Sequence, residues 1–67
     1  MADIELAAKD RQLLELLSHG LDQEAVARHL DISYGAMVSK VRILRARLNA
    51  NTTTHLVAVA LRTKLIK

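Results

Sequence analysis

The stretch LDQEAVARHLDISYGAMVSKVRILRARL, residues 21–48, decides the fold of this chain. Asp22 is a favourable N-cap for a first helix. That helix places three apolar residues on one face: Ala25, Val26 and Leu30. Residues 31–32 leave room for only a short turn before Ser33, which can cap the next helix. Because two helices joined this tightly must cross steeply, the stretch predicts a helix-turn-helix unit.

The second helix of this unit, residues 34–48, has an apolar face and a slim opposite face. At 100° per residue the apolar face consists of Met37, Val41, Leu44 and Leu48. Directly opposite lie Gly35, Ser39, Arg42 and Ala46. Three cations border this small-residue face: Lys40, Arg45 and Arg47. A helix with a slim outer face and cationic flanks suits the major groove of DNA.

Two further helices complete an all-α domain. Leucines at helical spacing over residues 8–18, followed by Gly20, predict one helix and its C-terminal cap. A polar connector precedes an apolar helix at about residues 54–64, which a Thr among residues 52–54 can cap. We therefore expect four helices, at about 8–18, 22–30, 34–48 and 54–64, in a single domain of residues 1–67. Residues 1–7 are expected to form a loose arm, with Ile4 or Leu6 against the core.

Charge divides the chain into two unlike halves. Residues 1–31 carry all seven acids and three bases, and therefore a net charge of −4. Residues 32–67 carry seven bases and no acid, and therefore +7. The second half is expected to seek a polyanion, nucleic acid or an acidic protein. The chain has no cysteine, no apolar run long enough to span a bilayer and an acidic N-terminus, so a cytoplasmic location is expected.

The C-terminal helix is more apolar than a core of this size requires. Residues 56–61, LVAVAL, leave it almost no polar face in its middle. One side can pack inside while another, formed by Val57, Leu61 and Leu65 at four-residue spacing, meets a partner. We therefore expect a homodimer through this helix.

Most of the chain resembles the LuxR-type, or GerE-like, helix-turn-helix family. The resemblance is carried by LLELLSHG (13–20), LDQEAVARHL (21–30), IS (32–33) and MVSKVRILRARL (37–48). It implies a sequence-specific regulator of transcription that binds double-stranded DNA with residues 34–48 in the major groove. Many members carry a further receiver or ligand-binding domain, and if the chain is complete we expect a stand-alone DNA-binding domain. Ala58 and Ala60 lie in the helix that the family often uses to dimerise.

Three departures from the family pattern fall on the expected DNA-binding surface. Residues 36–38 read Ala-Met-Val where members typically have Thr-Val-Lys, so a usual base or phosphate contact is missing at Val38. Lys40 replaces a frequent His, and Glu24 replaces a frequent phosphate-facing Lys. The fold is implied by the resemblance, whereas the DNA sequence that would be read is not.

Residues 33–47 supply the candidate DNA contacts. Arg42 is the first choice for base readout, because a guanidinium can bind guanine bidentately; Ser39 could meet a base edge and Val38 a thymine methyl. Phosphate contacts are expected from Lys40, Arg45 and Arg47. The free N–H groups at the start of the helix could also hold a phosphate, beside Ser33, Tyr34 and Gly35.

An enzyme is not expected. The three histidines, His19, His29 and His55, lie in separate segments without ligand spacing, and no catalytic triad or carboxylate pair accompanies them. No metal, cofactor or small-molecule substrate is therefore predicted. A second hypothesis is an adaptor or inhibitor that binds transcription machinery or another regulator, favoured by Glu24, Val38 and Ile43. A third is an architectural or recombination accessory factor that binds several adjacent DNA sites.

Overall fold

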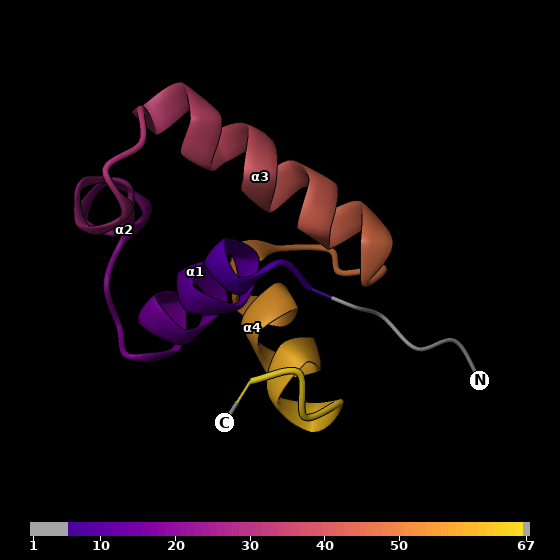
Figure 1. Cartoon of the computed structure of the whole chain (residues 1–67). Coiled ribbons are helices and arrows are strands. Elements are labelled where there is room, and N and C mark those ends of the chain that lie inside the picture. The colour runs from indigo at the N-terminus through magenta and orange to yellow at the C-terminus, as the bar shows by residue number, and fades with distance from the viewer. Residues whose placement is uncertain (1–5, 67) are drawn as a thin grey trace.

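The computed structural model describes residues 6–66, which form four helices (Figure 1). These are α1 (Ala8–Ser18), α2 (Gln23–Leu30), α3 (Tyr34–Arg47) and α4 (Thr53–Arg62), and no strand occurs between residues 6 and 66. The all-helical prediction is confirmed. The predicted bounds of α1 are also confirmed, and those of the other helices differ by one or two residues. Of the expected arm, residues 1–5 lie outside the described part, while Leu6 packs against the core as predicted.

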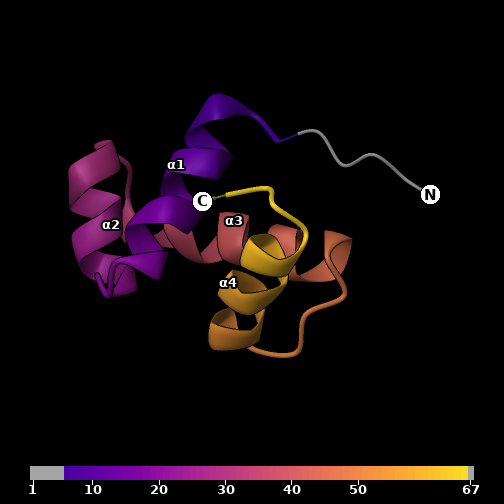
Figure 2. The ribbon, with the colours of Figure 1, turned by 90° about the horizontal axis from the view of Figure 1, so that it is seen from below.

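The helices surround one shared core. α3 packs against α2 and α4, and α1 packs against the same two helices. Figures 1 and 2 show α1 between α2 and α4, with α3 along one edge of the domain. In Figure 1, α2 is seen nearly along its axis while α3 runs across the view, so the two helices cross steeply. Three residues, 31–33, join them, as the sequence predicted.

Every helix contributes to the buried core. The largest fully buried side chains are Leu13, Leu14, Val26, Met37, Leu44 and Leu56. The predicted inward face of α3 is confirmed, because Met37, Val41 and Leu44 are buried and Leu48 is buried just after the helix. No polar or charged residue is buried between residues 6 and 66. Burial of this face fixes the direction in which the rest of α3 points.

Side-chain caps fix the starts of three helices. Asp22 accepts a hydrogen bond from the Ala25 N–H at 2.8 Å, and Ser33 accepts one from the Ala36 N–H at 3.1 Å. Thr52 does the same for the His55 N–H at 3.0 Å. These bonds satisfy backbone donors that a helix start leaves without partners. Both predicted caps are confirmed, and Thr52 is the threonine that caps α4.

Within two residues of its end, each helix is followed by a left-handed residue and then by an apolar residue that packs against the core. The left-handed residues are Gly20, Asp31, Asn49 and Lys64, with φ of 94°, 58°, 55° and 63°. The apolar residues that follow them are Leu21, Ile32, Ala50 and Leu65. After α2, α3 and α4 the apolar residue donates its N–H to the carbonyl five residues back, at 2.8 to 3.0 Å, as in a Schellman motif. Only the first of these ends was visible in the sequence, because only it uses glycine.

The end of α4 corrects one prediction. The helix stops at Arg62, two residues short of the predicted end, and Lys64 turns the chain back. Leu65 consequently lies beyond the helix and packs against the core. Because α4 ends at Arg62, Leu65 does not continue the helical stripe of Val57 and Leu61 that the sequence predicted. Leu61 remains 43% exposed.

Replacing Lys64 by glycine is expected to stabilise the fold. A left-handed conformation costs a side-chain-bearing residue about 1–2 kcal/mol, and glycine would remove this cost. Part of the gain is offset because glycine has more conformational freedom to lose from the unfolded chain. Lys64→Gly should therefore raise the free energy of unfolding by about 0.5–1 kcal/mol in urea denaturation. Lys64→Ala is the control, because it removes the same side chain but keeps the strained φ. Equal stabilisation by both variants would contradict the explanation.

Candidate nucleic-acid interface

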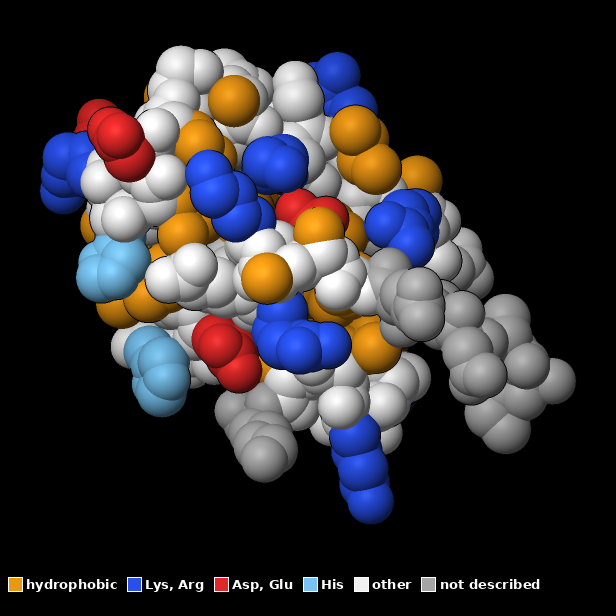
Figure 3. Space-filling model, in the orientation of Figure 1, with side chains coloured by type: hydrophobic (Ala, Val, Ile, Leu, Met, Phe, Trp, Pro, Cys, Tyr) orange, Lys and Arg blue, Asp and Glu red, His pale blue; other side chains and the backbone are white. Residues whose placement is uncertain are grey.

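The outward face of α3 consists of small side chains around one arginine. Gly35, Ser39, Arg42 and Ala46 are all exposed, as the helical spacing predicted. Tyr34 and Ile43 are also exposed, at 57% and 58%. Val38, predicted to contact a base, is half-buried at the margin of this face. Figure 3 shows Lys and Arg side chains spread over the side of the molecule that includes α3, with fewer acidic side chains among them.

Arg42 stands free at the middle of this face. Its side chain makes no hydrogen bond and no ion pair with any residue between 6 and 66. Ser39 and Ala46, one turn before and one turn after it, are too short to cover the guanidinium. Arg42 therefore presents its donors to solvent and to whatever ligand approaches α3.

Lys40 is not free. Its Nζ lies 3.3 Å from Asp10 Oδ1 on α1, and the two form an ion pair. The Lys40 side chain is 37% exposed and that of Asp10 is 17% exposed, so the pair is partly shielded from water. Asp10 lies in the first turn of α1, where a negative charge also interacts favourably with the helix dipole. The contact joins residues thirty positions apart, and no local pattern could reveal it.

Arg45 is held by the connection between α3 and α4. Its Nη2 donates to the carbonyl oxygen of Asn51, and its Nε is shielded from solvent without a hydrogen-bond partner among the described residues. The Asn51 N–H in turn donates to His55 Nδ1 at 3.1 Å. Of the three cations predicted to contact phosphates, two are thus engaged within the domain: Lys40 by Asp10 and Arg45 by Asn51. Arg47, in the last position of α3, is exposed and also has an interaction partner.

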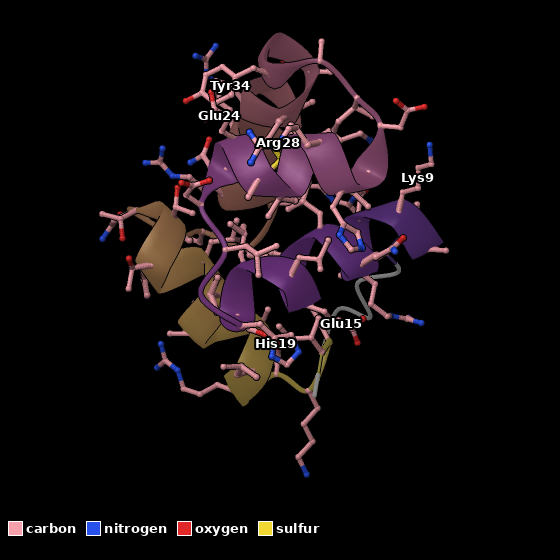
Figure 4. All side chains as sticks on the ribbon, turned by 90° about the vertical axis from the view of Figure 1, so that its left-hand side faces the viewer. Lys9, Glu15, His19, Glu24, Arg28 and Tyr34 are labelled. Carbon is pink, nitrogen blue, oxygen red and sulfur yellow. The ribbon has the colours of Figure 1, made fainter. Side chains whose placement is uncertain are left out.

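The start of α3 is open to ligands. Ser33 and Tyr34 are exposed, and a Cβ built at Gly35 would meet no atom within 4 Å. Glu24 lies on the neighbouring α2 and pairs with Arg28 at 3.6 Å. In Figure 4 the side chains of Tyr34, Glu24 and Arg28 project from the same side of the domain. The acidic charge beside the start of α3 therefore has a cationic partner on its own helix.

A second surface feature lies between α4 and the corner that joins α1 to α2. It is an open groove of about 580 Å³. Its apolar lining comes from Leu17, Leu21, Val57, Ala58 and Leu61, and its polar rim includes Asp22, Gln23, Thr53 and Thr54. Gln23 joins α2 to α4 at the rim of this groove, because its Nε2 donates a hydrogen bond to Thr53 Oγ1 at 3.2 Å. Two of the predicted dimer residues line this groove, whereas the contribution of the α1–α2 corner was not predicted.

The histidines do not come together. His19 and His29 are exposed and His55 is half-buried, each on a different element. No group of three His, Cys, Asp or Glu residues within 6–66 could hold a metal ion. None of the described helices is long and apolar enough to cross a membrane.

No protein-family model, no curated protein and no solved structure matches this chain. The exposed residues of α3 and the motifs of residues 13–48 are therefore the basis for a functional proposal.

The two glycines are expected to respond oppositely to the same substitution. Gly35→Ala should raise the free energy of unfolding by about 0.5–1 kcal/mol, because alanine is the better helix former and has open space there. Gly20→Ala should lower it by about 1 kcal/mol, because the φ of +94° strains any side-chain-bearing residue. Urea denaturation of both variants measures the difference. Destabilisation by Gly35→Ala would show that something already packs against that position.

Proposed function

We propose that this chain is a sequence-specific, double-stranded DNA-binding transcription regulator of the LuxR-type helix-turn-helix class, acting in the cytoplasm. The observation that carries the proposal is the exposed face of α3, where a free Arg42 lies among small side chains. The short turn between α2 and α3 supports it, because that connection leaves α3 at the edge of the domain. The +7 charge of residues 32–67 favours the same class of ligand.

The dimensions of α3 match those of the major groove. An α-helix with its side chains is about 10–12 Å across, and the groove is about 12 Å wide. Bulky side chains in place of Gly35, Ser39 and Ala46 would hold the helix away from the base edges. With small residues there, the guanidinium of Arg42 can reach guanine O6 and N7, the commonest specific contact in this groove.

Phosphate contacts are expected at both ends of α3, on either side of Arg42. The start of α3 offers backbone N–H groups and the positive end of the helix dipole, beside Ser33, Tyr34 and Gly35. Arg47, at the other end of the helix, adds a cation. Together these groups can contact phosphates at the two ends of α3 and so set its position along the groove.

Removal of the Arg42 guanidinium is expected to weaken binding to a preferred site by about 1–3 kcal/mol, or about 5- to 150-fold. The site would be selected from a random duplex pool and titrated by fluorescence anisotropy with Arg42→Ala. Affinity for unrelated duplex should change much less. Arg62→Ala is the control, because it removes the same charge from α4. If the two variants lose equal affinity for both duplexes, Arg42 does not read a base.

We further propose that the chain binds DNA as a homodimer through α4 and the groove beside it. Leu61 protrudes at the groove edge, and an apolar side chain from a second copy can fill the space above Leu17, Leu21 and Val57. A symmetric pair buries both grooves at once. Two copies of α3 could then enter successive major grooves about 34 Å apart, and the site would be pseudo-palindromic.

Leu61→Glu is expected to prevent this dimer. A carboxylate cannot be buried in an apolar interface without a partner, and Leu61 is exposed enough for the monomer to fold normally. Sedimentation equilibrium should show monomers for Leu61→Glu and dimers for the unmodified chain. Ile43→Glu, which alters an exposed isoleucine of α3, should leave the dimer intact. A dimer that survives Leu61→Glu would place the interface elsewhere.

A protein-binding adaptor or inhibitor is the second candidate. The observation that favours it is the exposure of Tyr34 and Ile43 on α3, combined with the internal contacts of Lys40 and Arg45. Exposed apolar side chains suit a protein surface better than a phosphate backbone. Co-purification with one stoichiometric partner, together with failure to enrich any motif from random duplex, would favour this candidate over DNA binding.

A further inference from the structure

The ion pair between α1 and α3 does more than join two helices. We propose that Asp10 limits the number of DNA phosphates contacted by α3, because it holds the ammonium group of Lys40. Asp10 is thus a positioning residue for a DNA contact, although it lies on α1. This inference rests on the DNA-binding function proposed above.

The geometry gives Asp10 control of the ammonium. Lys40 Nζ lies 3.3 Å from Asp10 Oδ1, and the carboxylate side chain is the more shielded of the two, at 17% exposure against 37%. Asp10, the more shielded partner, lies in the first turn of α1, where its negative charge also interacts favourably with the helix dipole. The more exposed lysine is therefore the partner that can move. It retains enough exposure to approach a ligand once the carboxylate releases it.

An internally paired lysine adds little to DNA affinity. A free protein cation that neutralises a phosphate releases counterions from the DNA, and this release drives binding at low salt. To neutralise a phosphate, Lys40 would have to leave Asp10. It would then exchange a carboxylate partner for a phosphate partner, with little net gain in affinity. Arg42, two residues further along α3, has no such competitor.

Asp10→Asn is the direct test, because it keeps the shape of the side chain and removes its charge. The variant should bind duplex about three- to tenfold more tightly at 0.1 M salt. The slope of log K against log salt should become steeper by about 0.9, the value for one added phosphate contact. Because the contact is to phosphate, preferred and unrelated duplexes should gain alike. Circular dichroism and thermal melting check that the variant is folded.

Two further variants separate release of Lys40 from a general change of charge. Glu15→Gln removes one negative charge from the same helix and should leave the salt slope unchanged. Lys40→Met should have a small effect on the unmodified chain, and in the Asp10→Asn background it should abolish the whole gain. This difference between backgrounds is the sharpest readout, since a long-range charge effect would make the Lys40→Met penalty equal in both.

The outcomes distinguish this inference from the function on which it rests. If the unmodified chain binds duplex and Asp10→Asn leaves the salt slope unchanged, only the control by Asp10 is overturned. The same holds if Lys40→Met costs equal affinity in both backgrounds. If no variant, nor the unmodified chain, binds duplex, the proposed function is overturned and this inference with it.

Discussion

Burial of one face of α3 is the constraint on which the rest of this structure depends. Met37, Val41 and Leu44 pack into the core shared by all four helices, and this packing sets the rotation of α3 about its axis. A chain this short has a marginal core, so it cannot easily leave that face uncovered. The same rotation directs the opposite face outward. Fold stability and the presentation of Arg42 therefore have a common cause.

The connections between helices follow from the same shortage of chain. The connections between the four helices are three to five residues long, and each contains one left-handed residue. The apolar residue after each reversal packs back on the core, so even the turns contribute to burial. The left-handed conformation at Asp31 is what permits the short connection before α3. At Asp31 and Asn49 this conformation is strained, whereas at Gly20 it is not, because glycine has no Cβ.

Cations in the second half of the chain serve two purposes. Arg45 binds the carbonyl of Asn51 and Lys40 binds the carboxylate of Asp10, so both help to fix elements around α3. A positive charge on a helix therefore does not by itself indicate a ligand contact. On α3, Lys40 has a shielded anionic partner, whereas Arg42 has no ion-pair or hydrogen-bond partner among residues 6–66.

The sequence by itself determined the four helices, the inward face of α3 and the caps at Asp22 and Ser33, because these follow from periodicity and from hydrogen bonds three residues apart. It also placed Arg42 correctly on the outward face. Only the tertiary structure decided which cations are already engaged, since Asp10 and Lys40 meet across thirty residues. It likewise packed Leu65 against the core and placed the α1–α2 corner beside α4, so that both line one groove. Local patterns carry one-dimensional spacing, whereas these contacts depend on how the helices pack.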